Sequence, residues 1–357
     1  MTLVLNDDQV RDLITMPECI EAMELAYADL PAGNGIYRVR TDMVAPATGE
    51  RSIFSLKSMD GVIPRFGVGS IRINSDILRY REEGGKLRRD RVPADADGRY
   101  VGFVLVFSST TGEVLLLYPD SVQSMRVASI TALGIRYLAR KNARSIALIG
   151  SGVQAKAQMA AALAVTRPEV VRCFSTNKER REQFCADMSA KHGVDIQPVA
   201  KPEDAVRGAD IVLCGTNSRS HVFFKDWLEP GMHVSCINMF EFEPAVIQAA
   251  DIVSTHIRDC DPIFIKAAGV GTMPEEPGAG FQNLAAATDF ANLPTIADYV
   301  SGSVTGRTSD SQITCMVNSV GCGYQFAAVG YLLNKKARER GIGLELPSSL
   351  FTSVPEQ

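Results

Sequence analysis

The fold of this 357-residue chain is decided by the stretch Ser145-Ile146-Ala147-Leu148-Ile149-Gly150-Ser151-Gly152-Val153-Gln154-Ala155. Its first five residues form a short apolar run, which is typical of a buried parallel strand. The run ends in the pattern Gly-x-Gly-x-x-Ala, and residues 156–165 have a helical pattern. A strand, a glycine-rich turn and a helix in this order predict a dinucleotide-binding unit of the Rossmann type.

The small residues of this motif each have a physical role at such a site. Gly150 allows the tight turn, Gly152 lets a diphosphate approach the backbone, and Ala155 lets the helix pack closely on the strand. The first helical turn, with Val153 and Gln154, directs free N–H groups and the positive end of the helix dipole at phosphates. We therefore predict that these five residues bind a nicotinamide cofactor. A glycine-rich turn without a ligand is the alternative.

The residues after the second predicted strand, 170–175, indicate which nicotinamide cofactor is bound. An acid at this point would bind the ribose 2′-hydroxyl of NAD, but residues 175–177 contain none. A 2′-phosphate requires cations and hydrogen-bond donors, so the pattern favours NADP(H) and leaves NAD(H) open. The basic residues can equally begin a solvated helix. The predicted contacts are Ser175, Thr176, Asn177, Lys178 and Arg180.

Composition limits the class of protein. The chain is 46% hydrophobic and 22% charged, which is typical of a soluble globular enzyme with two domains. Its net charge of −4 favours neither nucleic acid nor an anionic membrane. We find no membrane-spanning run or signal peptide and expect a cytoplasmic protein. The eight scattered cysteines suggest buried free thiols, and the four histidines lack metal-ligand spacing, so no metal is expected.

The rest of the chain predicts a second domain. Residues 6–30 have a helical pattern that Pro17 divides, with Asn6 or Asp7 as the first cap. Residues 79–99 are densely charged, which predicts a solvated loop, with a flap over a site as the alternative. Other ranges predict strands within 38–78, a hairpin at 101–118, a helix at 121–140, alternating strands and helices to 254, and a helix at 310–340.

With these residues placed, four stretches carry a family resemblance. The chain reads SMRVASITAL at 124–133 and IGSGVQA at 149–155, and it has related matches at 210–234 and 306–321. In this combination it resembles the ornithine cyclodeaminase/mu-crystallin family. The resemblance implies a homodimer of α/β fold, in which a Rossmann-type doubly wound parallel sheet is inserted in an α+β domain for substrate binding and dimerisation. We expect residues 126–319 to form the nucleotide domain, and 1–125 with 320–357 to form the other.

The resemblance also implies a cationic set that binds the carboxylate of an amino or imino acid. Arg40 and Arg126 match two arginines of the family, and Arg72 stands where the family usually has lysine. Arginine binds carboxylates through two parallel hydrogen bonds but is a poor proton shuttle near neutral pH. Lys57 is a further candidate for substrate binding, with an outward-facing strand position as the alternative. The family's nucleotide contacts fall at Thr216 and Asn217, where a cap or turn is an equal interpretation.

A second departure from the family lies at residues 237–245. Family cyclodeaminases have an aspartate in a glycine-rich loop here, and this chain has a shorter loop without it. Glu241 is a candidate catalytic residue beside Arg72 and Arg126, with a solvated turn as the alternative, and Glu243 matches the family's structural glutamate. The missing aspartate argues against ring-forming deamination.

Three functions are therefore open. The leading hypothesis is an NAD(P)-dependent oxidoreductase acting on a C–N bond, as an imino-acid or ketimine reductase or an amino-acid dehydrogenase. The second is an ornithine- or lysine-type cyclodeaminase with bound NAD. The third is a non-catalytic, crystallin-like protein that binds NADP.

Overall fold

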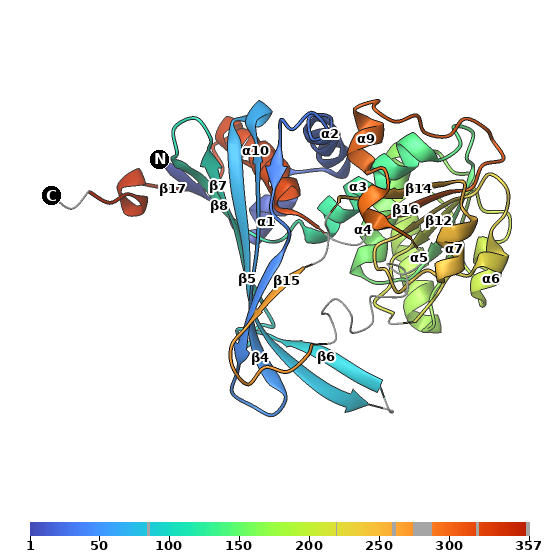
Figure 1. Ribbon diagram of the computed structural model, residues 1–357, viewed down its shortest axis with the longest axis horizontal. Helices are drawn as coiled ribbons and strands as arrows, with labels where there is room; N and C mark the ends of the chain where they lie inside the picture. Colours follow the sequence, from blue (N-terminus) through green and yellow to red (C-terminus); the bar gives the residue numbers. More distant parts are fainter. Residues whose placement is uncertain (84–85, 219, 259–261, 274–287, 319–320, 355–357) are drawn as a thin grey trace.

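The computed structural model describes residues 1–83, 86–218, 220–258, 262–273, 288–318 and 321–354. These residues form two lobes, each built on its own β-sheet (Figure 1). Ten described strands make one sheet and seven make the other. The prediction of an α/β protein with a separate second lobe is confirmed.

The seven-stranded sheet is parallel throughout its described ladders. Its order is β11-β10-β9-β12-β13-β16-β14, so the chain reverses direction across the sheet between β9 and β12. This is the doubly wound topology that places ligands at the carboxyl ends of the strands. The strands are β9 (Ser145–Ile149), β10 (Val170–Phe174), β11 (Ile196–Pro198), β12 (Ile211–Cys214), β13 (His233–Cys236), β14 (Ile252–Thr255) and β16 (Thr314–Val317); the helices are α4 (Val153–Val165), α5 (Lys178–His192), α6 (Pro202–Val206) and α7 (Pro244–Ala249).

The ten-stranded sheet has the order β15-β3-β4-β5-β7-β8-β1-β17, with β2 on β4 and β6 on β5. Long antiparallel ladders between β4, β5 and β7 form its centre. The strands are β1 (Thr2–Val4), β2 (Ile36–Tyr37), β3 (Thr41–Pro46), β4 (Ser52–Ile63), β5 (Val68–Glu83), β6 (Lys86–Val92), β7 (Val101–Ser108), β8 (Val114–Pro119), β15 (Ile263–Lys266) and β17 (Leu344–Leu346).

The two faces of this sheet differ, because side chains alternate along each strand. We call the face that carries Met59, Arg72 and Val104 the inner face; these residues lie opposite one another on β4, β5 and β7, and all are buried. The outer face is apolar and half-buried. Its residues include Leu56, Ile71, Ile73, Phe103 and Leu105.

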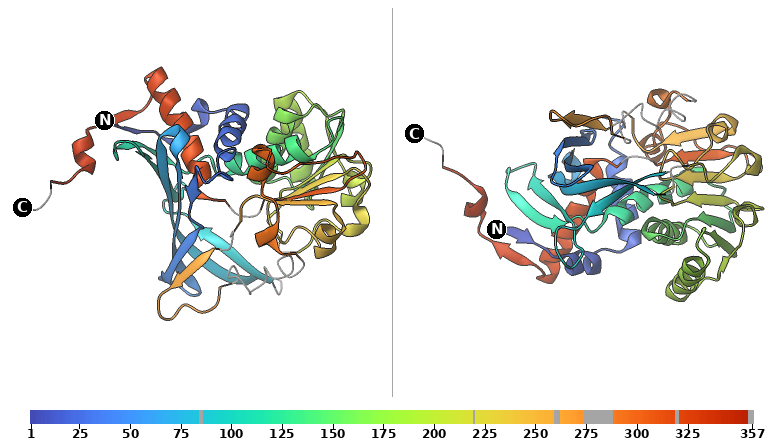
Figure 2. Two further views of the ribbon diagram at one scale, coloured as in Figure 1. Left: turned by 45° about the horizontal axis from the view of Figure 1, so that its top comes forward. Right: turned by 90° about the horizontal axis from the view of Figure 1, so that it is seen from below.

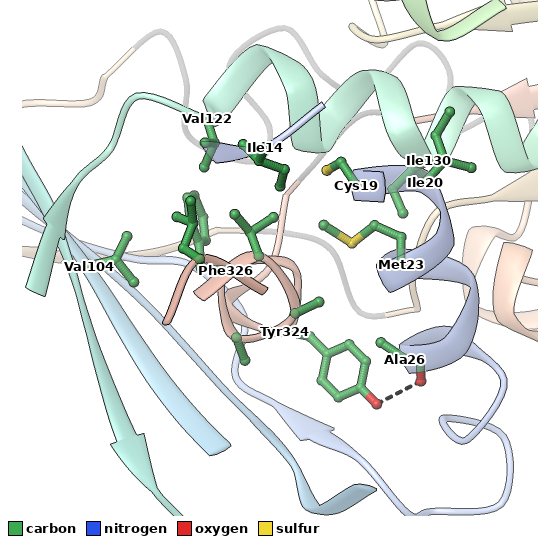
Figure 3. Packing of buried hydrophobic residues seen from close by; sticks show 14 of the residues in the cluster. Ile14, Cys19, Ile20, Met23, Ala26, Val104, Val122, Ile130, Tyr324 and Phe326 are labelled. Carbon is green, nitrogen blue, oxygen red and sulfur yellow. Dashed lines mark hydrogen bonds between the residues drawn. The ribbon is translucent and has the colours of Figure 1, made fainter. Parts of the chain in front are cut away.

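Helices cover the inner face. The last long helix, α10 (Gly323–Arg340), contacts β4 and β5, and α2 (Met16–Tyr27) and α3 (Gln123–Leu138) pack beside it. Figure 3 shows Phe326 and Tyr324 in this core, where the Tyr324 hydroxyl donates to the carbonyl of Ala26 at 2.8 Å. The remaining helical segments are α1 (Asp7–Leu13), α9 (Ile296–Val300), η1 (Pro64–Phe66), η2 (Lys225–Trp227), η3 (Phe290–Asn292) and η4 (Ser348–Phe351).

The first helices begin where the sequence predicts. The side chain of Asn6 accepts from the backbone N–H of Gln9, and the Gln9 side chain accepts in return from the Asn6 N–H, which caps α1. Pro17 lies in the first turn of α2, where its missing N–H costs no helical hydrogen bond. The division of residues 6–30 into two helices is therefore confirmed.

Two sequence predictions are wrong. The loop predicted at residues 79–99 is wrong up to Val92, because β5 runs to Glu83 and pairs with β6 (Lys86–Val92) in a hairpin; of the described residues in this range, only 93–99 are irregular. Residues 310–340 are not one helix, because the apolar run Thr314–Val317 is β16, between β13 and β14. The structure also adds β15 to the ten-stranded sheet beside β3, although it falls in the range predicted for the nucleotide domain.

The cysteines agree with the sequence prediction. Seven are described, and all seven are free and buried; Cys260 lies outside the described residues. Among the described helices, none combines the length and the apolar character needed to cross a bilayer.

Candidate functional site

The glycine-rich turn between β9 and α4 has room for a diphosphate. Gly150 has a φ of +122°, and a Cβ atom built on it would lie 2.4 Å from the carbonyl oxygen of Gly215, so only glycine fits this turn. A Cβ atom built on Gly152 meets nothing within 4 Å. Val153, the first residue of α4, is 75% exposed. Open space in front of uncapped helical N–H groups suits an anionic group, so the turn fits the predicted cofactor.

The carboxyl end of β10 has no carboxylate among residues 175–177. The Ser151 hydroxyl donates to the Ser175 hydroxyl at 2.9 Å, which links the glycine turn to this strand end. The side chain of Asn177 accepts from the backbone N–H of Arg180 at 2.8 Å and so caps α5. Lys178 and Arg180 are exposed at the start of α5, where they can approach a ribose phosphate; Lys178 also lies 3.9 Å from Glu182 in an exposed ion pair. Thr176 is exposed as well. The preference for NADP(H) stays a prediction.

Two arginines meet on the inner face of the ten-stranded sheet. Arg72, on β5, donates from Nε to the Asp120 carboxylate at 2.8 Å and also contacts it through Nη2. Arg126, on α3, donates from Nη1 to the Gln325 side chain at 2.5 Å. Both guanidinium groups lie against the ring of Phe326, with Cζ atoms 5.5 and 4.5 Å from its centre. We call Arg72 and Arg126 the arginine pair.

The two guanidinium groups of the arginine pair are buried, and one carboxylate, that of Asp120, is too little to neutralise both. Arg126 is only 2% exposed, and its Nε has no hydrogen-bond partner among the described residues. Burial lowers its pKa to about 10, and the Asp120 carboxylate opposes this shift. The side chain of Asp120 is 5% exposed, so one carboxylate serves two guanidinium groups. Because a buried charge requires a counter-ion, the pair is suited to bind a second carboxylate.

The arginine pair adjoins the carboxyl edge of the parallel sheet. The side chain of Asn318, directly after β16, donates to the Val127 carbonyl at 2.8 Å and so fastens this strand end to α3. A Cβ atom built on Gly321 would lie 2.0 Å from Nη1 of Arg126. The chain that leaves β16 therefore passes against the guanidinium group. The turn at Gly150 ends a strand three places away in the same edge, roughly 14 Å at the usual strand spacing.

Arg40 and Lys57 lie on the same side of the sheet but are paired with acids. Arg40 donates to Asp42 at 2.9 Å. Lys57 Nζ lies 3.3 Å from Oδ2 of Asp76, whose other oxygen accepts from Arg91 at 2.7 Å. The outward-facing alternative for Lys57 is thus not what the structure has, since its side chain is 17% exposed. The structure groups Lys57 with Asp76 and Arg91, at some distance along β5 from the arginine pair.

Glu241 is fully buried and binds backbone. Oε1 accepts from the N–H and the hydroxyl of Thr216 at 2.6 and 2.7 Å. Oε2 accepts from the N–H groups of Ile237 and Asn238 at 2.9 and 3.1 Å. The carboxylate thereby joins the ends of β12 and β13 at the nucleotide edge. The solvated turn considered from the sequence is wrong, and the contacts favour a positioning role for Glu241 over the predicted catalytic one.

The neighbours of Glu241 account for three other predictions. Thr216 is held by Glu241, whereas Asn217 is exposed and free to contact a nucleotide. Glu243 accepts from the Lys225 N–H at 3.0 Å and lies at the start of α7. The buried structural glutamate of this region is therefore Glu241, two residues earlier than the family resemblance suggested.

Replacing Glu241 with glutamine is expected to destabilise the fold by roughly 2 to 3 kcal/mol. An amide nitrogen cannot accept hydrogen bonds, so at least one buried N–H loses its acceptor. Burial raises the pKa of Glu241 to about 7, although the four donors oppose the rise. Since the unfolded carboxyl ionises near 4.5, the folded state holds more protons between these values, and wild-type stability falls as the pH rises through that window and is level above it. The deficit of the variant is therefore larger at pH 5 than at pH 8.

Denaturant unfolding at both pH values measures this difference. The control is Glu243→Gln, which removes a single half-buried acceptor and should cost less at either pH. Equal stability of Glu241→Gln and the wild type would contradict the assigned contacts.

Three residues that contact the predicted site residues were not identified as partners from the sequence: Asp120, Gln325 and Asp76. Asp120 follows β8 and is 48 positions from its partner Arg72. Gln325 lies in the first turn of α10, 199 positions from Arg126. Asp76 could have been found, because Arg72, Asn74 and Asp76 alternate with other residues along one strand. That alternation places polar groups on a covered face, where each needs a partner.

Comparison with known proteins agrees with this architecture. The model of the ornithine cyclodeaminase/mu-crystallin family matches residues 93–340. A Δ1-pyrroline-2-carboxylate reductase from a strain of Bacillus cereus is 27% identical over 348 residues, which cover 96% of this chain and 98% of that protein. Among solved structures, the Thermococcus litoralis Δ1-pyrroline-2-carboxylate reductase, in complex with NADH and L-proline, has a TM-score of 0.76 at 22% identity and covers 97% of this chain and 100% of its own. The iminosuccinate reductase of Paracoccus denitrificans, in complex with NAD⁺, has a TM-score of 0.75 at 20% identity, covering 97% and 99%.

Proposed function

Because the chain belongs to the ornithine cyclodeaminase/mu-crystallin family, we propose that it is an NAD(P)H-dependent reductase of imino acids. The observation that carries this proposal is the arginine pair: two buried guanidinium groups with the single carboxylate of Asp120 near them, at the edge of the parallel sheet where the glycine turn is open. The names of similar proteins, which include reductases of pyrroline-2-carboxylate, support the same reaction class.

In the proposed reaction, NAD(P)H held at the glycine turn would supply the hydride that reduces the imine carbon, while the C=N π electrons move to nitrogen and nitrogen takes up a proton. The arginine pair binds the α-carboxylate and so orients the imine carbon toward the cofactor. A guanidinium does not release its proton near neutral pH, which assigns Arg72 and Arg126 to binding. The proton is therefore supplied by water or by a nearby acidic group.

The cofactor proposal extends to NADP(H). An acid at the end of β10 would repel a 2′-phosphate, and residues 175–177 supply none. Lys178 and Arg180 stand exposed at the start of α5, where the helix dipole also favours an anion. NAD(H) is the alternative, and it is the cofactor named for two of the similar solved structures.

A steady-state assay tests the function. The purified protein is given Δ1-pyrroline-2-carboxylate or Δ1-piperideine-2-carboxylate with NADPH or NADH, and cofactor oxidation is followed by absorbance. We expect turnover with at least one cyclic imine, and a higher kcat/KM with NADPH. Ammonia release from ornithine or lysine without net cofactor reduction would instead identify a cyclodeaminase. Tight cofactor binding without turnover across a wide imine panel would favour the non-catalytic alternative.

We further propose that two copies of the chain associate through the outer face of the ten-stranded sheet. That face carries a broad apolar surface with Leu56, Ile73 and Phe103 near its centre, and none of the described helices lies over it (Figures 1 and 2). Met43 and Ile265 extend this surface on β3 and β15, at 43% and 54% exposure. An uncovered apolar face of this extent is typical of a protein interface, and a second copy presents a matching surface.

Replacing Leu56 with arginine is expected to convert the dimer into monomers at micromolar concentration. The substitution places a charge in the centre of the apolar face, where the partner's surface would bury it without a counter-ion. Sedimentation velocity measures the mass. Gln197→Arg, on the exposed edge strand β11, is the control and should stay dimeric. A wild-type protein that sediments as a monomer would refute the interface.

A further inference from the structure

A polar strip runs along the inner face beyond the arginine pair. Arg72, Asn74 and Asp76 occupy alternate positions of β5 and point to the same side, and all three are buried. Lys57 lies opposite Asn74 on β4. Arg91, on β6, lies opposite Leu78 and reaches back to Asp76. At about 3.3 Å per residue, the strip extends roughly 7 Å to the level of Lys57 and roughly 13 Å to Asp76.

Charge along this strip is unbalanced at both ends. At one end the arginine pair has a single carboxylate, that of Asp120. At the other end Lys57 and Arg91 share a single carboxylate, that of Asp76. Between the two ends, Arg40 and Asp42 form a balanced pair. At each end, two cations therefore share one carboxylate: Arg72 and Arg126 share that of Asp120, and Lys57 and Arg91 share that of Asp76.

The positively charged end of the strip, with Lys57 and Arg91, is partly enclosed. The side chain of Lys57 is 17% exposed and that of Asp76 is 4% exposed. Burial lowers the pKa of Lys57, although the Asp76 and Asp42 carboxylates oppose the shift. Arg91 is part-exposed at the rim, where its guanidinium stacks on the Tyr100 ring at 4.2 Å. The β5–β6 hairpin that carries Arg91 extends toward the lobe of the parallel sheet (Figures 1 and 2).

We propose that the substrate is an imino acid with a second carboxylate at the end distal to its α-carboxylate, and that Lys57 and Arg91 bind this second group. This inference rests on the proposed reductase function. The arginine pair binds the α-carboxylate, and the second surplus charge has no counterpart in a monocarboxylic substrate. The offset of Lys57, roughly 7 Å along the strand, together with the length of its side chain, suits a diacid with several atoms between its carboxylates. Each end of the strip then becomes electrically balanced when substrate is bound.

Matched pairs of substrates test the proposal on the wild-type protein. 2-Oxoglutarate with ammonium, which forms a diacid imine, is compared with 2-oxopentanoate and ammonium, which forms a monoacid imine of the same chain length. Δ1-Piperideine-2,6-dicarboxylate is compared with Δ1-piperideine-2-carboxylate. We expect kcat/KM to favour the diacid by at least tenfold in one or both pairs. Glutarate should likewise inhibit more strongly than pentanoate, and this measurement requires no variant.

Substitutions then assign the preference to residues. Arg91→Leu and Lys57→Met are each expected to lower the diacid-to-monoacid ratio of kcat/KM about tenfold, which corresponds to about 1.4 kcal/mol of lost charge pairing. Lys57→Arg keeps the charge and should retain part of the preference. Arg11→Leu removes an arginine from an exposed ion pair with Asp7 and is the control that should leave the ratio unchanged.

The outcomes separate this inference from the function on which it rests. Reduction of monoacid imines without a preference for diacids would overturn the inference and leave the reductase function intact. A diacid preference that persists in both Arg91→Leu and Lys57→Met would overturn the assignment to these residues. If none of the imines in either pair is reduced, the proposed reductase function is itself contradicted.

Discussion

Arg126→Leu is expected to lower kcat/KM for imine reduction by about a thousandfold while the dissociation constant for NADPH stays within a factor of about two. Removing one partner of a buried charge pair typically costs about 2 to 5 kcal/mol, and about 4 kcal/mol corresponds to that factor. The cofactor is unaffected because Arg126 belongs to α3 and contacts Gln325 and Phe326, away from the glycine turn. Initial rates and a fluorescence titration measure the two quantities.

The fold should tolerate this change because it leaves no carboxylate without a cation. Asp120 pairs directly with Arg72, and that pair stays intact when the second guanidinium is removed. Arg136→Leu is the matched control, since Arg136 lies on the same helix and pairs with Glu24 outside the site. An Arg126→Leu enzyme with near wild-type kcat/KM would show that the substrate carboxylate binds elsewhere.

Gly152→Asp is expected to weaken nucleotide binding at least a hundredfold and to leave the thermal stability unchanged or raised. Gly152 has φ −87° and ψ −171°, a conformation open to any residue, and a Cβ atom there meets nothing within 4 Å. Aspartate is moreover a favourable cap for a helix such as α4. A diphosphate placed against the new carboxylate would be repelled by several kcal/mol at the effective dielectric of a protein surface, enough for this loss.

Gly150→Ala is expected to damage the fold itself, unlike Gly152→Asp, which should block nucleotide binding and keep the fold stable. Its Cβ atom would approach the Gly215 carbonyl to 2.4 Å, and its φ of +122° is strained for alanine, so the expected effect is a lower melting temperature. Calorimetric titration with NADPH and thermal unfolding of both variants distinguish a blocked site from a damaged fold. Normal nucleotide affinity in Gly152→Asp would mean that the diphosphate does not bind at this turn.

The nucleotide lobe could be predicted because its decisive features are local. Gly150, Gly152 and Ala155 form one short motif between a strand and a helix, and the structure has both elements at those positions. The same kind of reasoning failed for β16. Its four residues are all buried and lie close to the start of α10, and such a short run has no period that separates a buried strand from a helix.

The β5–β6 hairpin was missed for a different reason. A two-stranded ribbon that extends beyond the rest of the sheet buries little apolar surface. Its strands therefore carry many charged residues and lack the alternation of apolar and polar residues that identifies a half-buried strand. Strand pairing with the rest of the sheet, which the sequence does not reveal, holds β5 in place.

The site could be predicted only in part. Arg72 and Arg126 were identified from the sequence and the structure brings them to one ring, that of Phe326. Their partners Asp120 and Gln325 depend on strand register and on where α10 docks, which are tertiary properties. Glu241 was identified for its position in the loop, but its hydrogen bonds to the ends of β12 and β13 depend on the parallel register of those strands.

Strand β15 belongs to the ten-stranded sheet, although the strands before and after it in the chain, β14 and β16, belong to the parallel sheet. This arrangement affects how hybrid enzymes of this kind could be made. The chain passes between the two sheets four times, from β8 to β9, from β14 to β15, from β15 to β16, and from β16 to β17. Grafting a homologue's cofactor half would therefore need four splice points that agree at once. A hybrid made with a single crossover between β3 and β15 would pair β3 of one parent with β15 of the other, so the two parents would have to agree at this ladder.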